Sequence, residues 1–159
     1  MIGERSPMVK TLVLGIGNTI RGDDGIGIYV ARALRKILPH DYQVKELSTG
    51  GLELMEAMSG YQKVFLIDAI RTLGATPGHV HHLSLQDFAY HHSLSSSHGL
   101  SLRQILEWGK KIVDKQMPEE VEIIAIEAPC VGEFAEGLSP RLQEQFAMIV
   151  ERVKEEIRG

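Results

Sequence analysis

The chain has little of what marks a secreted, membrane-bound or nucleic-acid-binding protein. Its single cysteine, Cys130, excludes an internal disulfide and a multi-cysteine zinc cluster. No apolar stretch nears the roughly 18 residues of a membrane span, and the first ten residues hold no hydrophobic segment of signal-peptide length. The net charge is −4 and no basic stripe is present, which disfavours a nucleic-acid partner. We expect a soluble, cytoplasmic protein that binds neither membranes nor nucleic acids.

The hydrophobic residues, 43% of a chain of 159, suffice for one ordinary core. Strand-like and helix-like segments alternate, with no repeat or linker between them, so we expect a single domain over residues 1–159. The expected strands are Lys10–Leu14, Tyr42–Leu47, Lys63–Ala69, His79–Leu85 and Val121–Ala128. Helices are expected after Asp24, after Gly51, over Leu100–Val113 and after Ser139, where Pro140 suits a first helical turn. This order predicts an α/β fold with a twisted sheet between helices.

The loop Gly15–Gly27, GIGNTIRGDDGIG, follows the first expected strand directly and opens a helix. Gly17 and Gly22 have the outer spacing of a phosphate-binding loop, in which Lys and then Ser or Thr should follow. Asp23 and Asp24 stand there instead, and two carboxylates repel phosphate and attract cations. The dinucleotide pattern G-x-G-x-x-G also fails, because its third glycine is absent. We therefore expect no nucleotide cofactor, and either aspartate can cap the following helix.

Two aspartates are expected at the same edge of the sheet. Asp24 follows the first strand by a loop, and Asp68 ends the third strand, so both should lie beyond the carboxyl ends of parallel strands, where ligands bind. A carboxylate at the end of an apolar strand is costly to desolvate unless it is paired or bound to a cation. The alternatives are that Asp24 only caps a helix and that Asp68 only accepts loop N–H groups. The occurrence of both at one edge favours a binding site.

Seven histidines offer a third ligand. His79 and His81 share one face of an expected edge strand and are a possible ligand pair, but with no carboxylate partner visible nearby the favoured interpretation is solvated side chains. His91 and His92 lie in a polar loop, where the same interpretation applies. His98 lies at a junction between that loop and a helix, which can fold back over the edge of the sheet. Spacing alone does not choose among them.

The one cysteine raises the hypothesis of a nucleophile with a histidine as its base. The segment around Cys130, APCVGEF, matches no local cysteine-protease signature, and a lone cysteine beside a buried strand is typical of a small apolar filler. A serine nucleophile has no G-x-S-x-G segment to support it.

Four segments, in order along nearly the whole chain, resemble the [NiFe]-hydrogenase maturation endopeptidases. The glycine loop has the form G-x-G-N-x-x-x-x-D-D-G-x-G, and VFLIDAI (residues 64–70) resembles that family's apolar strand ending in aspartate. SSSHGLSL (residues 95–102) is similar to its S-x-H-x-x-x-L segment, which singles out His98 among the histidines. AIEAPCVGEFAEGLSP (residues 125–140) resembles its closing strand and the start of its last helix.

The resemblance implies a three-layer sandwich in which a twisted five-stranded sheet has helices on both faces. It implies that Asp24, Asp68 and His98 form the site and recognise nickel, which the substrate supplies. The substrate would be a [NiFe]-hydrogenase large-subunit precursor, which loses a C-terminal extension after nickel insertion. Separately from the resemblance, no long apolar surface helix argues for an obligate dimer, so we expect a monomer. Two carboxylates and an imidazole do suit a divalent first-row ion. For the base that activates water, Asp24 is the first candidate and Asp23 the second.

One segment departs from the family pattern. Many members have D-G-G-T or a similar sequence after the second strand, where this chain has ELSTGG with an acid at Glu46. Two other functions stay open: a nickel carrier or checkpoint module without peptidase activity, built on the same three ligands, and an unrelated metallohydrolase. The absence of H-E-x-x-H disfavours the metallohydrolase.

Overall fold

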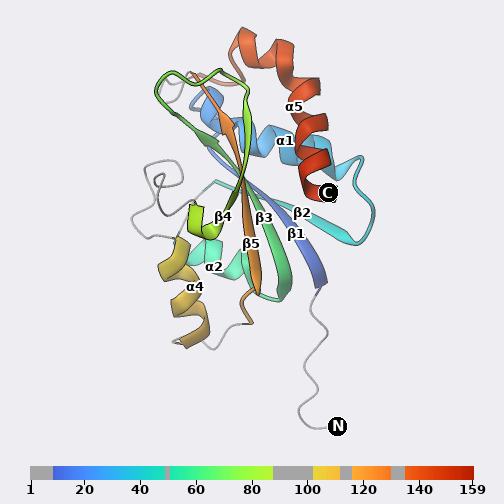
Figure 1. The fold of residues 1–159 in the computed structure, drawn as a ribbon, viewed down its shortest axis with the longest axis vertical. Coiled ribbons are helices and arrows are strands. Elements are labelled where there is room, and N and C mark those ends of the chain that lie inside the picture. The colour runs from blue at the N-terminus through green and yellow to red at the C-terminus, as the bar shows by residue number, and fades with distance from the viewer. Residues whose placement is uncertain (1–8, 49–50, 88–101, 112–115, 130–134) are drawn as a thin grey trace.

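A five-stranded sheet runs through the middle of the computed structural model, which describes residues 9–48, 51–87, 102–111, 116–129 and 135–159 (Figure 1). Its strands are β1 (Val9–Ile16), β2 (Tyr42–Leu47), β3 (Tyr61–Ile70), β4 (Val80–Ser84) and β5 (Glu120–Glu127). They are arranged in the order β2-β1-β3-β5-β4. All neighbours pair in parallel except β4, which is antiparallel to β5. The four parallel strands therefore end together, at what we call the carboxyl edge of the sheet.

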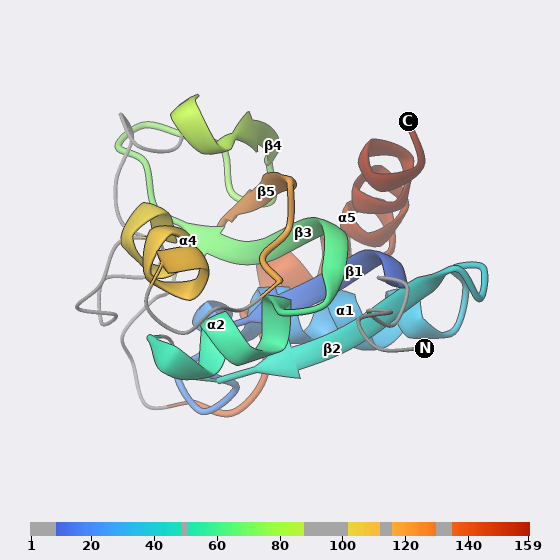
Figure 2. The ribbon, with the colours of Figure 1, turned by 90° about the horizontal axis from the view of Figure 1, so that it is seen from below.

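Helices cover both faces of this sheet (Figure 2). On one face lie α1 (Ile26–Arg35) and α5 (Pro140–Arg158), and on the other lie α2 (Leu52–Met58) and α4 (Leu102–Lys111). Each pair of helices closes its own cluster of buried apolar residues against the sheet. The α/β class and the three-layer sandwich with a five-stranded sheet are thus confirmed.

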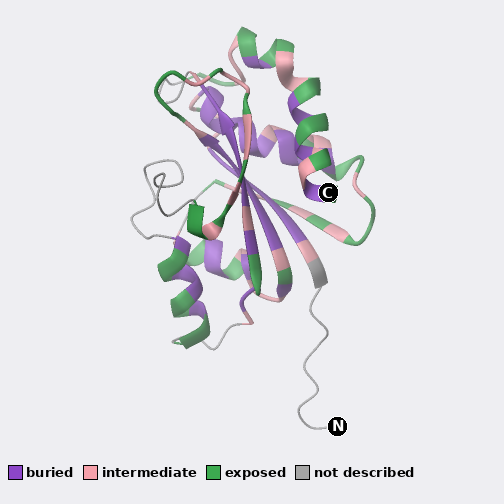
Figure 3. Ribbon diagram, viewed as in Figure 1, coloured by how far each residue is buried: buried purple, intermediate pink, exposed green. Residues whose placement is uncertain are grey.

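The side chains of the central strands alternate between the two clusters. Leu66 packs in the cluster under α2 and α4, whereas Ile67 packs in the cluster under α1 and α5, and both are fully buried. Strands buried on both faces read as continuous apolar runs, which is why β1 and β3 were recognisable in the sequence. Figure 3 shows the buried residues concentrated along the central strands and the inner sides of the helices. By the same alternation Asp68, two residues after Leu66, belongs to the α2/α4 face.

The helix boundaries test two predicted caps. Ser139 is the N-cap of α5, with its hydroxyl accepting the N–H of Leu142 at 3.5 Å, and Pro140 begins that helix as predicted. The cap predicted for α1 is wrong. Its N-cap is Gly25, with no side-chain cap hydrogen bond, because Asp23 and Asp24 form a 3₁₀ turn before the helix begins. No helix among the described residues combines the length and hydropathy that crossing a membrane requires.

Candidate active site

Glycines bring the loop between β1 and α1 close to the backbone of the sheet. Gly17 has a φ of +156°, and a Cβ there would collide with the carbonyl oxygen of Asp24. At Gly27, a Cβ would collide with the carbonyl oxygens of Ile16 and Ile67. The start of α1 therefore lies directly against β1 and β3, one residue away from Asp68. This close approach, not phosphate binding, accounts for these glycines.

Asp24 lies in the 3₁₀ turn Asp23–Gly25, which packs against β3. Only 3% of Asp24 is exposed. The turn is part of the wall of the carboxyl edge, and the carboxylate is withdrawn from bulk water. A carboxylate in that position has a high desolvation cost unless polar or cationic groups surround it.

Asp68 is 1% exposed and lies opposite Ala125 of β5 in the parallel register. Its Oδ1 accepts the N–H of Ala69 at 2.8 Å. The strand continues beyond it to Ile70, so Asp68 is inside the strand, not its last residue. The structure thus places Asp24 and Asp68 at the carboxyl edge, as predicted, and it buries both carboxylates.

Asp23 has a different role from its neighbour. It is fully buried, and its Oδ1 accepts the backbone N–H of Ser139 at 2.6 Å. Backbone bonds reinforce the same junction, with Gly22 donating to the carbonyl of Ala135 at 2.7 Å. This geometry favours a structural role for Asp23, which joins the glycine loop to the start of α5. It disfavours the hypothesis that Asp23 is the base that activates water.

The third predicted ligand, His98, lies outside the described residues, as do His91, His92 and Cys130. The helix that follows His98 is described: the buried residues of α4 join the apolar cluster on the α2/α4 face, which is the face of Asp68. In the described ranges no three His, Cys, Asp or Glu residues are grouped to hold a metal ion. A complete ligand set would therefore draw on residues outside those ranges, as the predicted set with His98 does.

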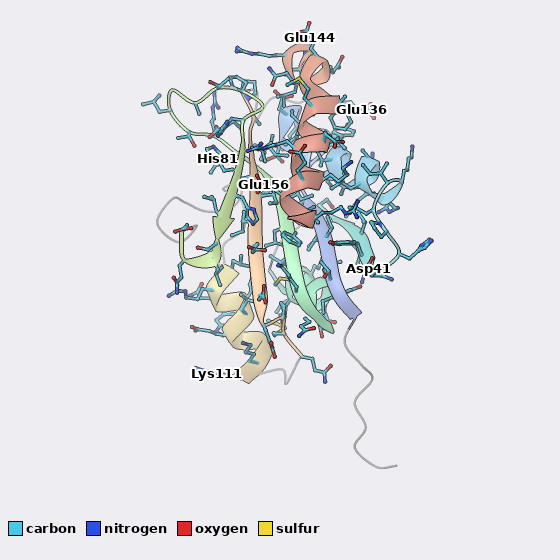
Figure 4. All side chains as sticks on the ribbon, turned by 45° about the vertical axis from the view of Figure 1, so that its right-hand side comes forward. Asp41, His81, Lys111, Glu136, Glu144 and Glu156 are labelled. Atoms are coloured by element: carbon cyan, nitrogen blue, oxygen red, sulfur yellow. The ribbon has the colours of Figure 1, made fainter. Side chains whose placement is uncertain are left out.

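Two histidines of β4 have carboxylate partners, which corrects the expectation of a solvated side chain at His81, whereas His79 is exposed. His81 Nε2 lies 2.9 Å from Glu127 Oε1, and the rings of His79 and His81 meet edge to face with centroids 4.6 Å apart. His82, on the other face, lies 2.8 Å from Glu156 of α5 and 3.1 Å from Glu122. Figure 4 labels His81 on β4 and Glu156 on α5. These contacts hold the edge strand to its neighbours.

Glu127, which is 3% exposed at the end of β5, was not among the residues predicted from the sequence. The signal was present, because IIAIE ends an apolar strand with an acid just as VFLID does. In addition to its contact with His81, its Oε2 accepts the N–H of Thr72 at 3.0 Å.

The acid in the altered loop segment also has partners. Glu46 of β2 forms ion pairs with Arg32 and Arg35 of α1, at 3.0 and 3.1 Å. Both arginines are about half exposed, so these pairs add little stability. They direct the Glu46 side chain towards α1, so this carboxylate links β2 to that helix.

Comparison with known proteins identifies the family. The HycI hydrogenase maturation protease family model matches residues 28–156, a range that includes Asp68 and His98 and begins after Asp24. The hydrogenase 2 maturation protease of Escherichia coli is 27% identical over 148 residues, covering 91% of this chain and 88% of that protein. Among solved structures, the hydrogenase maturating endopeptidase HybD from E. coli superimposes with a TM-score of 0.72 at 25% identity, covering 94% of this chain and 92% of that one. HybD from Thermococcus kodakarensis gives a TM-score of 0.70 at 25% identity, covering 92% and 97%. The chain belongs to the hydrogenase maturation protease family and is a peptidase.

Proposed function

We propose that this peptidase removes the C-terminal extension of a [NiFe]-hydrogenase large-subunit precursor after nickel has been inserted, and that it recognises the nickel through Asp24, Asp68 and His98. The observation that carries the proposal is the pair of buried carboxylates at the carboxyl edge, from the 3₁₀ turn and from β3. The chain's membership of the family and its relatives' names support it.

The chemistry of the donor set fits a nickel ion carried by the substrate. Carboxylate oxygens and an imidazole nitrogen bind divalent first-row ions, and a site with only three protein donors leaves positions for ligands of the substrate. Burial of Asp24 and Asp68 lowers the local dielectric, which strengthens their attraction to a cation. Recognition of this kind requires the precursor and the metal together. The proposed form is a monomer that acts on the loaded precursor without a nucleotide.

Cleavage of the peptide bond requires a base that activates water near the scissile carbonyl. Asp24 remains the first candidate, because the turn that carries it lies at the open end of the sheet and Asp23 is engaged with Ser139. Asp68 is held within the hydrogen-bonded ladder between β3 and β5, so it suits the role of a metal ligand with a fixed position.

Mass spectrometry of the precursor tests the proposal. Nickel-loaded and nickel-free forms of the cognate precursor are incubated with the protein, and their masses are compared. The proposal predicts the loss of one C-terminal peptide from the loaded form only. An intact loaded precursor would contradict it.

A nickel carrier or checkpoint module without peptidase activity would use the same three residues. The two functions differ in their affinity for the free ion, since a carrier has to bind nickel tightly without a precursor. Calorimetry with nickel alone separates them, because the peptidase proposal predicts weak binding of the free ion and a carrier requires tight binding. The family assignment favours the peptidase.

A further inference from the structure

A cavity of about 460 Å³ lies at the carboxyl edge, between the loop Arg71–Pro77 and the end of β5. The loop begins three residues after Asp68, so the cavity adjoins the proposed site along β3. Its lining includes Arg71, Leu73, Ala75, Pro77, Glu127 and Pro129.

The side chain of Glu127 ties this loop to the sheet. One carboxylate oxygen accepts the N–H of Thr72 at 3.0 Å, and the other lies 2.9 Å from His81 Nε2. The backbone of Glu127 bonds the same region, because Gly78 donates to its carbonyl at 2.8 Å and its own N–H donates to His79 at 2.9 Å. A single residue of β5 thereby fixes both ends of the loop that walls the cavity.

We propose that this cavity binds the precursor polypeptide beside the scissile bond, taking an apolar side chain, and that Glu127 is the positioning residue of the loop that forms it. The inference rests on the proposed function. Asp68 itself is held by the β3–β5 ladder, so Glu127 acts on the loop and leaves the proposed metal ligand in place.

The chemistry of the lining supports a peptide as the occupant. Alanine, proline and leucine side chains supply apolar surface, which favours an apolar side chain of the substrate. Arg71 is exposed and makes no ion pair with any residue that the structure describes, so its guanidinium is available to donate to carbonyl oxygens of an extended chain. Leu73 is fully exposed at the rim, where an apolar side chain gains by being covered.

Steady-state kinetics of cleavage of the nickel-loaded precursor test the inference, because a binding subsite should affect KM and leave kcat nearly unchanged. Glu127→Ala releases the loop at Thr72 and leaves the backbone bonds to Gly78 and His79 in place. KM should therefore rise about tenfold, the effect of losing one hydrogen bond to a charged group, with kcat nearly unchanged. Glu127→Gln keeps an acceptor for Thr72 and a donor for the His81 ring, so it should restore KM. A purely structural role would lower the amount of active protein and leave KM as it is.

The chain offers a matched control. Glu122, on the same strand, also contacts a histidine of β4, but it lies far from the carboxyl edge and on the other face. Glu122→Ala should leave KM unchanged. An equal rise of KM in both variants, or no rise in Glu127→Ala, would overturn the inference while the proposed function stands.

If Glu127→Ala does not fold, a second variant tests the inference. If the wild type does not cleave the precursor, a binding measurement tests it. Ala75→Phe fills the cavity without touching Glu127 and should raise KM as well. Hydrogen exchange, which needs no turnover, should show residues 71–77 protected by bound precursor in the wild type and less so in Ala75→Phe. Absent turnover with protection of the loop would reject the proposed function alone, and an unprotected loop in a bound complex would reject the subsite.

Discussion

The carboxylate of Asp23 accepts the backbone N–H of Ser139 at 2.6 Å, across 116 residues of sequence. This bond joins the glycine loop to the first turn of α5, whose N-cap is Ser139 itself. The neighbouring Asp24 is buried in the same turn. Asp23 thus holds the turn in place, and the turn keeps Asp24 buried at the carboxyl edge of the sheet.

Removing that bond should destabilise the protein. Asp23→Ala leaves the N–H of Ser139 without its acceptor and should lower the free energy of unfolding by about 2 kcal/mol. Asp23→Asn keeps an oxygen acceptor and should cost less. Urea denaturation measures both, with Asp41→Ala as the control, since Asp41 is exposed and its loss should change stability by less than about 0.5 kcal/mol. Equal stability of Asp23→Ala and wild type would show that the bond contributes nothing.

Gly27→Ala should be strongly destabilising, although alanine is the better helix former by about 1 kcal/mol. Its Cβ would collide with the carbonyl oxygens of Ile16 and Ile67, so α1 must move off the sheet, at a cost of about 3 kcal/mol or more. Gly137→Ala is the control, because its φ is +87° but no atom lies within 4 Å of the added Cβ. Its cost should be only the 1–2 kcal/mol or so of a left-handed residue. Thermal denaturation that ranks the two variants in the opposite order would contradict this packing.

The predicted third ligand is tested by binding. His98→Ala should weaken the affinity for nickel-loaded precursor and leave the affinity for nickel-free precursor unchanged, because the imidazole would contact only the metal. Fluorescence anisotropy with labelled precursor measures both. His40→Ala, a change in an exposed loop before β2, is the matched control. Undiminished binding of the loaded form by His98→Ala would remove His98 from the ligand set.

Local patterns in the sequence predicted the layers of this fold and the positions of its aspartates. The apolar runs of β1 and β3 and the Ser139-Pro140 start of α5 are determined by nearby residues, so they could be recognised. The cap of α1, the burial of Asp24 and the partner of Asp23 depend on Ser139 and on β3, which are distant in sequence. The pairing of His81 with Glu127 likewise required the antiparallel β4–β5 register, which no spacing along the chain reveals.

The most direct test of the account is the single-turnover rate of cleavage of nickel-loaded precursor by the wild type, Asp24→Asn and Asp68→Asn. Asparagine has nearly the same shape and removes a buried charge, so both variants should melt within a few degrees of the wild type. Their cleavage rates should fall at least about a hundredfold, the contribution of a catalytic base or more. Cys130→Ala, measured in the same series, should cleave at the wild-type rate. Wild-type rates in both aspartate variants, or loss of activity in Cys130→Ala without unfolding, would contradict a site built on the two buried carboxylates.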